Sequence, residues 1–281
     1  MSRETVQTIE RGLKVLLAFS RERTEVSPSE LARTLGLPRT VVVRILNTLE
    51  QAGFLERVPG VSLYRIGLSA FEVGALYLAN NPLVAVADEL LADLVDKTGH
   101  TAYLGALYGN EAVILSLREG RSPVRFQWSA GDRLPATTTA LGKAILMHLA
   151  TSDVDRILGR GRLPGLTERS IKTRGELDRE LHAARDRGWT VAIDESYPGV
   201  CAVGAPILDG SGSPLAGMSI SFLNYPPNPD LFDQLGVLVC STAETVSRRI
   251  AAYHAYGHRS PLGRPPPAQP ASGRQAPMCG I

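Results

Sequence analysis

The 281-residue chain has few cysteines, few aromatic residues and no long apolar run. Its three cysteines, Cys201, Cys240 and Cys279, form no C-x-x-C pair, so we expect reduced thiols rather than a disulfide scaffold. The longest apolar stretches, near 75–79 and 235–240, fall far below the ~18–20 residues that cross a bilayer. The N-terminus is polar and lacks the apolar core of a signal peptide. These absences predict a cytoplasmic protein with no membrane partner.

Composition and charge indicate two parts with separate roles. Hydrophobic residues make up 44% of the chain and charged residues 21%, an ordinary globular balance over a length that suits about two domains. Residues 1–70 carry a net charge of +3, residues 71–254 carry −4 and residues 255–281 carry +3. A basic N-terminal segment on an acidic body favours a polyanion partner for that segment. The Gly- and Pro-rich stretch 255–281 is expected to be a disordered tail.

No metal and no cofactor is predicted. The sequence contains no glycine-rich phosphate loop and no H-E-x-x-H motif. His254 and His258 are spaced i,i+4, but they stand beside the Gly- and Pro-rich tail without a nearby acid or cysteine. We interpret this pair as a helix end rather than a zinc site.

Residues 5–67 have the outline of a winged helix-turn-helix. A first amphipathic helix is predicted from apolar residues at helical spacing, namely Val6, Ile9, Leu13, Leu16 and Leu17. Ser27 can cap a second helix, with Pro28 in its first turn, Glu30 able to close a capping box and Gly36 able to end it. Pro38 restarts a helix with an inward stripe of Val42, Ile45, Leu46 and Leu49. Two strands, 54–58 and 62–66, follow around Pro59-Gly60.

This order of elements predicts binding to double-stranded operator DNA through the third helix. In a helix-turn-helix the second helix of the pair enters the major groove, where Arg reads guanine and Asn reads adenine. The alternative is a solvated helix face in an ordinary bundle. The predicted DNA-binding residues are Ser29, Pro38, Arg39, Thr40, Val41, Val43, Arg44, Asn47, Arg57 and Arg65.

Residues 68–81 are predicted to form a linker helix. Leu68, Phe71, Ala75 and Leu78 share one stripe, and the sequence Asn80-Asn81-Pro82 breaks the helix. An apolar stripe at this boundary suits a contact between two copies of the chain, so a homodimer or homotetramer is expected.

Residues 82–254 are predicted to be an α+β domain with an antiparallel sheet and flanking helices. The expected helices are 83–99, 139–149, 174–187 and 232–254. The expected strands are 101–107, 112–117, 124–128, 190–193, 201–208 and 215–222.

The chain resembles the IclR family of bacterial transcriptional regulators across residues 5–252. The matching segments are VQTIERGLKVL at 6–16, SPSELARTLGLP at 27–38, GDRLPATTTALGKAIL at 131–146, TRGELDREL at 173–181, RGWTVAIDE at 187–195, GVCAVGAPI at 199–207 and MSISF at 218–222. The resemblance implies a winged helix-turn-helix, a linker helix and a C-terminal domain of GAF or PAS type. It also implies a dimer or tetramer that binds an operator and responds to a small organic or aromatic acid.

An effector site is predicted on one face of the strand that ends in 218–222. Ser219 and Ser221 share a face there, and two small hydroxyls leave room and supply donors for a carboxylate. The start of the helix at 140–143 would add backbone N–H groups. The resemblance, with Ser219 and Ser221, gives the effector residues Leu134, Ala140, Leu141, Ala192, Asp194, Ala202, Ser219 and Ser221.

Departures from the family pattern suggest a less polar pocket and a larger or more aromatic ligand. Ala192 stands where relatives often have an acid, Thr137 where they have His, and Ala202 where they have Cys.

Two other classes of function stay open at this stage. A small-molecule-processing enzyme on a GAF-like domain would need a nucleophile such as Ser219, Ser221 or Cys201, yet nothing in the sequence sets a base beside any of them. Asp194 and Glu195 are adjacent and would point to opposite faces of a strand, which does not suit an acid–base pair. We therefore predict that the protein is not an enzyme. The third class is a dimerising DNA-binding protein without a ligand.

Overall fold

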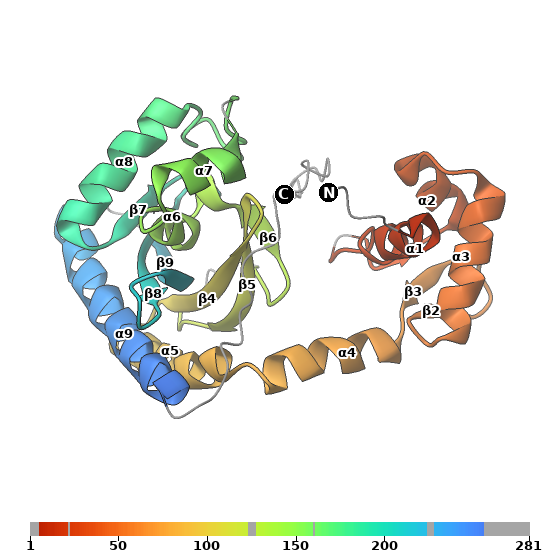
Figure 1. Ribbon diagram of the computed structural model, residues 1–281, viewed down its shortest axis with the longest axis horizontal. Coiled ribbons are helices and arrows are strands. Elements are labelled where there is room, and N and C mark those ends of the chain that lie inside the picture. The colour runs from red at the N-terminus through yellow and green to blue at the C-terminus, as the bar shows by residue number, and fades with distance from the viewer. Residues whose placement is uncertain (1–5, 22, 123–127, 160, 224–227, 256–281) are drawn as a thin grey trace. The chain divides into compact units, whose positions relative to one another are not determined.

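A computed structural model describes residues 6–21, 23–122, 128–159, 161–223 and 228–255 (Figure 1). The chain divides into two units between Asn80 and Asn81. The tail expected at 255–281 lies outside the described residues from residue 256 onward, and Cys279 with it. The strand expected at 124–128 also lies outside them except for Trp128, which is not in a strand.

The first unit is a winged helix-turn-helix. Helices α1 (Gln7–Leu16), α2 (Pro28–Leu35) and α3 (Arg39–Gln51) pack on a small antiparallel sheet of order β1-β3-β2. The strands are β1 (Glu25–Val26), β2 (Leu55–Arg57) and β3 (Tyr64–Ile66), and helix α4 (Leu68–Ala79) follows. The fold class predicted for this part is confirmed, with β1 as an additional strand.

Local chemistry explains the turn between α2 and α3. The Ser27 hydroxyl accepts a hydrogen bond from the Glu30 backbone N–H at 3.2 Å, so Ser27 is the N-cap. Gly36 ends α2 at φ 62°, a left-handed conformation that glycine adopts without steric cost. The Glu30 carboxylate lies 3.6 Å from Arg23, and α2 shows the Ser27 half of the predicted capping box.

Most of the apolar stripe predicted for α1 faces outward, which the spacing alone did not indicate, and of its residues only Leu16 packs against the core of this unit. Ile9 is 61% exposed and Leu13 is 54% exposed, while Val15 on the opposite side is buried in the core of this unit. That core also contains Leu31, Val42 and Leu46. None of the residues of α4 is buried within the described structure, and Phe71 is 68% exposed. The first unit therefore exposes apolar residues on two of its helices, α1 and α4.

The second unit is built on a six-stranded antiparallel sheet of order β6-β5-β4-β9-β8-β7. Its strands are β4 (Thr101–Tyr108), β5 (Glu111–Arg118), β6 (Arg133–Pro135), β7 (Thr190–Ile193), β8 (Val200–Leu208) and β9 (Pro214–Leu223). Its helices are α5 (Pro82–Thr98), the 3₁₀ turn η1 (Ala136–Thr138), α6 (Ala140–Leu146), α7 (Thr151–Leu158), α8 (Arg174–Arg187) and α9 (Pro229–Ala255). The predicted α+β class is confirmed. Sequence patterns missed β6, η1 and α7, which have only three to eight residues each.

The two faces of this sheet are covered differently (Figure 1). Helices α5 and α9 pack on one face, where Met218, Ile220 and Phe222 join a large apolar core. Helix α6 packs on the other face, against Gly105, Gly204 and Gly217. A Cβ atom at Gly204 would lie 2.7 Å from the Ala140 carbonyl carbon, so only glycine permits this approach.

No single helix in the described ranges is both long and apolar enough to span a membrane. Helices α4 and α5 reach that threshold only jointly, as a pair bent by 78°.

Candidate functional site

Helix α3 presents a polar face above a buried apolar stripe. Val42, Ile45 and Leu46 are buried, which holds the helix against the core of the first unit. Arg39, Thr40, Arg44 and Asn47 are exposed on the remaining surface. Neither Arg39 nor Arg44 forms an ion pair with any carboxylate in the described part of the chain. Their guanidinium groups are therefore available to bases or phosphates without first breaking a salt bridge.

The other residues predicted around this helix differ in their surroundings. Ser29 and Pro38 are exposed, and Pro38 is the N-cap of α3. Val43 is partly buried, and Val41 packs against the core of the first unit. Val41 therefore has a packing role that the sequence prediction did not include.

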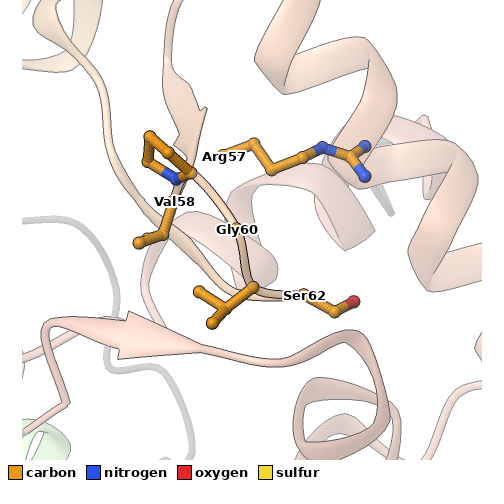
Figure 2. Close-up of a pocket in the computed structure, with 6 residues that line it drawn as sticks. Arg57, Val58, Gly60 and Ser62 are labelled. Carbon is orange, nitrogen blue, oxygen red and sulfur yellow. The ribbon is translucent and has the colours of Figure 1, made fainter.

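The two arginines of the predicted wing are held by carboxylates. Arg57 donates to Glu50 of α3 at 3.1 Å and to the Tyr64 hydroxyl at 2.6 Å. Figure 2 shows the Arg57 side chain extending away from the turn at Gly60. Arg65 donates to Glu56 at 3.0 Å. These arginines would have to exchange a carboxylate for a phosphate on binding DNA, unlike Arg39 and Arg44.

The turn of the wing is open. A shallow surface pocket runs along 57–62, and Gly60 at its tip adopts φ 79° with no atom near the position of a Cβ (Figure 2). A backbone this exposed can approach another molecule closely, as a wing does beside a DNA backbone.

Four of the predicted effector residues share the α6 side of the sheet. Ser221 pairs with Ala202 across β9 and β8, and Ala202 pairs with Ala192 across β8 and β7. Ser219 lies one step along the same face, opposite Gly204. Ser219 is buried, whereas Ser221 is partly exposed. Helix α6 packs over the glycines at 204 and 217, so the small residues just beyond them lie beside that helix. We call this set the floor, and it consists of Ser219, Ser221, Ala202 and Ala192.

The start of α6 is less available to an anion than the sequence suggested. The Thr139 hydroxyl already accepts the Gly142 N–H at 2.9 Å, and the Lys143 N–H donates to the Thr139 carbonyl at 3.0 Å. Ala140 and Leu141 place their backbone directly on Gly204 and Gly217. Leu134 is buried in β6, in an apolar cluster with the side chain of Leu141. Two of the N–H groups at this helix start, those of Gly142 and Lys143, are therefore already paired, and donation to a carboxylate by the others stays a prediction.

Asp194 and Glu195 lie beyond the end of β7. Asp194 adopts φ 57°, and its carboxylate accepts the Gly199 N–H at 2.7 Å, so it stabilises a turn. Glu195 is buried and pairs with Lys143 of α6 at 2.6 Å. Burial raises the pKa of Glu195, and the nearby Lys143 ammonium offsets only part of that shift. Both carboxylates lie outside the sheet, because the chain leaves it after Ile193, where the strand predicted at 190–193 ends.

A small pocket opens at the end of the sheet beside Ser221. Its lining also includes His100, Thr101 and Phe222. The His100 ring lies 5.6 Å from that of Phe222, and burial lowers the pKa of this histidine, which favours the neutral imidazole. Sequence reasoning missed this lining, because residues 100 and 221 are brought together only by the pairing of β4 with β9.

The structure thus defines a class of protein, a winged helix-turn-helix joined to an α+β domain built on an antiparallel sheet. Two family models match the chain. The IclR helix-turn-helix domain matches residues 8–59, and the bacterial transcriptional regulator IclR C-terminal domain matches residues 75–248. The chain belongs to the IclR family of bacterial transcriptional regulators. It is a DNA-binding transcriptional regulator.

Relatives and solved structures agree over most of the chain. The HTH-type transcriptional repressor AllR of Escherichia coli K12 is 31% identical over 247 residues, covering 88% of this chain and 91% of the relative. An IclR regulator from Alicyclobacillus acidocaldarius has a TM-score of 0.78 at 25% identity and covers 87% of this chain and 99% of its own. An IclR homologue from Microbacterium hydrocarbonoxydans, solved with 4-hydroxybenzoate, has a TM-score of 0.72 at 21% identity, covers 86% of this chain and 99% of its own, and supports the fold.

Proposed function

We propose that the protein is a dimeric repressor whose operator binding through α3 is controlled by an organic acid seated on Ser219 and Ser221. The single observation that carries the proposal is the placement of these serines. They stand on the sheet face beside α6, and the apolar core occupies the opposite face. Repression is inferred from the similarity to the AllR repressors. Because it acts on chromosomal DNA, we place the protein in the cytoplasm.

The exposed apolar helices support the dimer. A single helix-turn-helix covers a short half-site, and pairing two of them lengthens the recognised sequence. Apolar residues on α1 and α4 are exposed in the single chain, and we propose that the second copy covers them. The corresponding operator has two half-sites related by approximate twofold symmetry.

In this proposal the second unit binds its ligand and does not convert it chemically. Cys201, one of the candidate nucleophiles, is buried on the core side of the sheet, away from Ser219 and Ser221. Control of DNA binding instead requires that the acid binds the DNA-competent and DNA-incompetent arrangements unequally.

The test is the double variant Ser219→Ala with Ser221→Ala. A thermal-shift panel of benzoate, 4-hydroxybenzoate, propanoate, lactate, succinate and malate first identifies acids that bind the full chain. Hydrogen bonds to a charged group contribute about 1.5–3 kcal/mol each, so the double variant should bind such an acid at least tenfold more weakly. Operator affinity without ligand should stay at the wild-type value, because the DNA-binding residues belong to the other unit.

Ser241→Ala is the matched control, since that hydroxyl is exposed on α9 and donates only to the Leu238 carbonyl. Calorimetry and gel shifts on one preparation decide the outcome. A double variant that keeps full acid binding would move the ligand site elsewhere.

A further inference from the structure

The Tyr103 hydroxyl is a buried polar group that the fold leaves without a partner. Tyr103 is 2% exposed, and its hydroxyl forms no hydrogen bond to any described residue. The comparable buried tyrosine of the first unit, Tyr64, has its hydroxyl paired with Arg57 at 2.6 Å. Buried polar groups are nearly always paired, so this hydroxyl calls for a partner that the described residues do not supply.

The sheet register places Tyr103 on the proposed ligand floor. Tyr103 of β4 is directly opposite Ser219 of β9, and the next pair on that face is Thr101 with Ser221. In the opposite direction along the two strands, the next pair on that face is Gly105 with Gly217, and Leu141 of α6 packs on it. Tyr103 therefore lies on the same face of the sheet as the two serines, directly beside Ser219.

The surroundings of the ring separate a charged end of the site from a neutral end. The ring packs in an apolar cluster with Leu134, Leu141 and Ile145. Burial and the carboxylates of Glu119 and Asp132 raise the pKa of Tyr103, so the phenol stays protonated. The same carboxylates disfavour a second anion at this position. A ligand carboxylate is thus better placed at the serines, and a neutral hydroxyl or carbonyl at Tyr103.

We propose that Tyr103 is a specificity-determining residue of the effector site, which selects acids that carry a neutral hydroxyl or carbonyl group in addition to the carboxylate. This inference rests on the proposed function, because it assumes that the acid binds on Ser219 and Ser221. It adds a requirement that the serines alone do not impose. An acid without the second group leaves the phenol unpaired in the complex and binds less tightly.

The test compares matched acids on the full chain by calorimetry. The pairs are benzoate with 4-hydroxybenzoate, propanoate with lactate, and succinate with malate. In any pair that binds, the wild type should prefer the hydroxylated acid about tenfold. Tyr103→Phe should reduce that preference to within about twofold and leave the affinity for the parent acid unchanged. Tyr108→Phe is the control, because Tyr108 lies on the same strand and is exposed.

The possible outcomes separate the two proposals. If Tyr103→Phe keeps the wild-type preference, or if the wild type shows no preference in any pair that binds, the role of Tyr103 is overturned and the serine site stands. If no acid binds the wild type, the proposed effector class fails, and the inference fails with it. Thermal melting of Tyr103→Phe without ligand confirms folding, and a melting temperature at or above the wild-type value is expected because an unpaired buried hydroxyl is removed.

Discussion

Replacing individual arginines of the first unit should distinguish residues that recognise DNA bases from residues that contact the DNA phosphates. Arg39 and Arg44 are exposed on α3 and free of ion pairs within the described residues, so each enters the complex without losing a protein contact. A bidentate contact to a base contributes about 1–3 kcal/mol, so Arg39→Ala and Arg44→Ala should each weaken operator binding about 5- to 150-fold.

The wing arginines should behave differently because of their carboxylate partners. Arg57 would have to leave Glu50, and Arg65 would have to leave Glu56, to bind a phosphate. An exposed pair of this kind contributes about 0.2–1 kcal/mol to stability, which offsets part of a phosphate contact. Arg57→Ala should therefore weaken operator binding less than tenfold. It should also reduce the magnitude of the slope of log affinity against log salt by about 1. Glu50→Gln should increase DNA affinity, since it removes the negative charge that pairs with Arg57.

Fluorescence anisotropy with operator DNA, identified by selection from random oligonucleotides, measures these effects at several salt concentrations. Arg179→Ala, on the exposed surface of α8 in the other unit, is the control for loss of one positive charge. Wild-type affinity in both Arg39→Ala and Arg44→Ala, with unchanged melting temperatures, would refute the assignment of α3 as the reading helix. A larger loss of operator affinity in Arg57→Ala than in Arg39→Ala or Arg44→Ala would show that the wing dominates recognition.

Three further predictions concern assembly and packing. Phe71→Glu with Leu76→Glu should shift the protein toward monomer in sedimentation experiments, because both side chains are exposed on α4; an unchanged assembly state would remove α4 from the interface. Lys143→Met should destabilise the protein by about 3–5 kcal/mol at pH 7, since it leaves the buried Glu195 unpaired, and by less at pH 5, where Glu195 takes up a proton more readily. The raised pKa means that the folded state holds this proton more tightly, so stability falls as pH rises above the ordinary 4.5, and Glu195→Gln should flatten that fall in urea titrations. Gly204→Ala should lower the free energy of unfolding by about 1–3 kcal/mol, because the new Cβ would lie 2.7 Å from the Ala140 backbone. Gly210→Ala in the exposed hairpin turn should leave that free energy unchanged.

Local sequence was sufficient wherever a short stretch of chain determines its own structure. The cap at Ser27 and the left-handed Gly36 set the turn of the helix-turn-helix, and the spacing of Val42, Ile45 and Leu46 set the buried side of α3. The alternation in 218–222 likewise separated Ser219 and Ser221 from the core residues between them, as the strand shows. These features depend on neighbours within a few residues, so pattern and capping preferences were enough.

The tertiary structure decided what depends on residues far apart in the chain. Apolar spacing predicted α1 but not which side of it is buried, because Ile9 and Leu13 are exposed while Val15 packs inward. Lys143 and Glu195 are 52 residues apart, and only packing of α6 beside the end of β7 makes them an ion pair. The register of β4 with β9 brought Tyr103 opposite Ser219, and a shift of one residue would have put it on the other face. Sequence thus determined the elements and their local ends, whereas strand register and helix packing determined which side chains meet at the site.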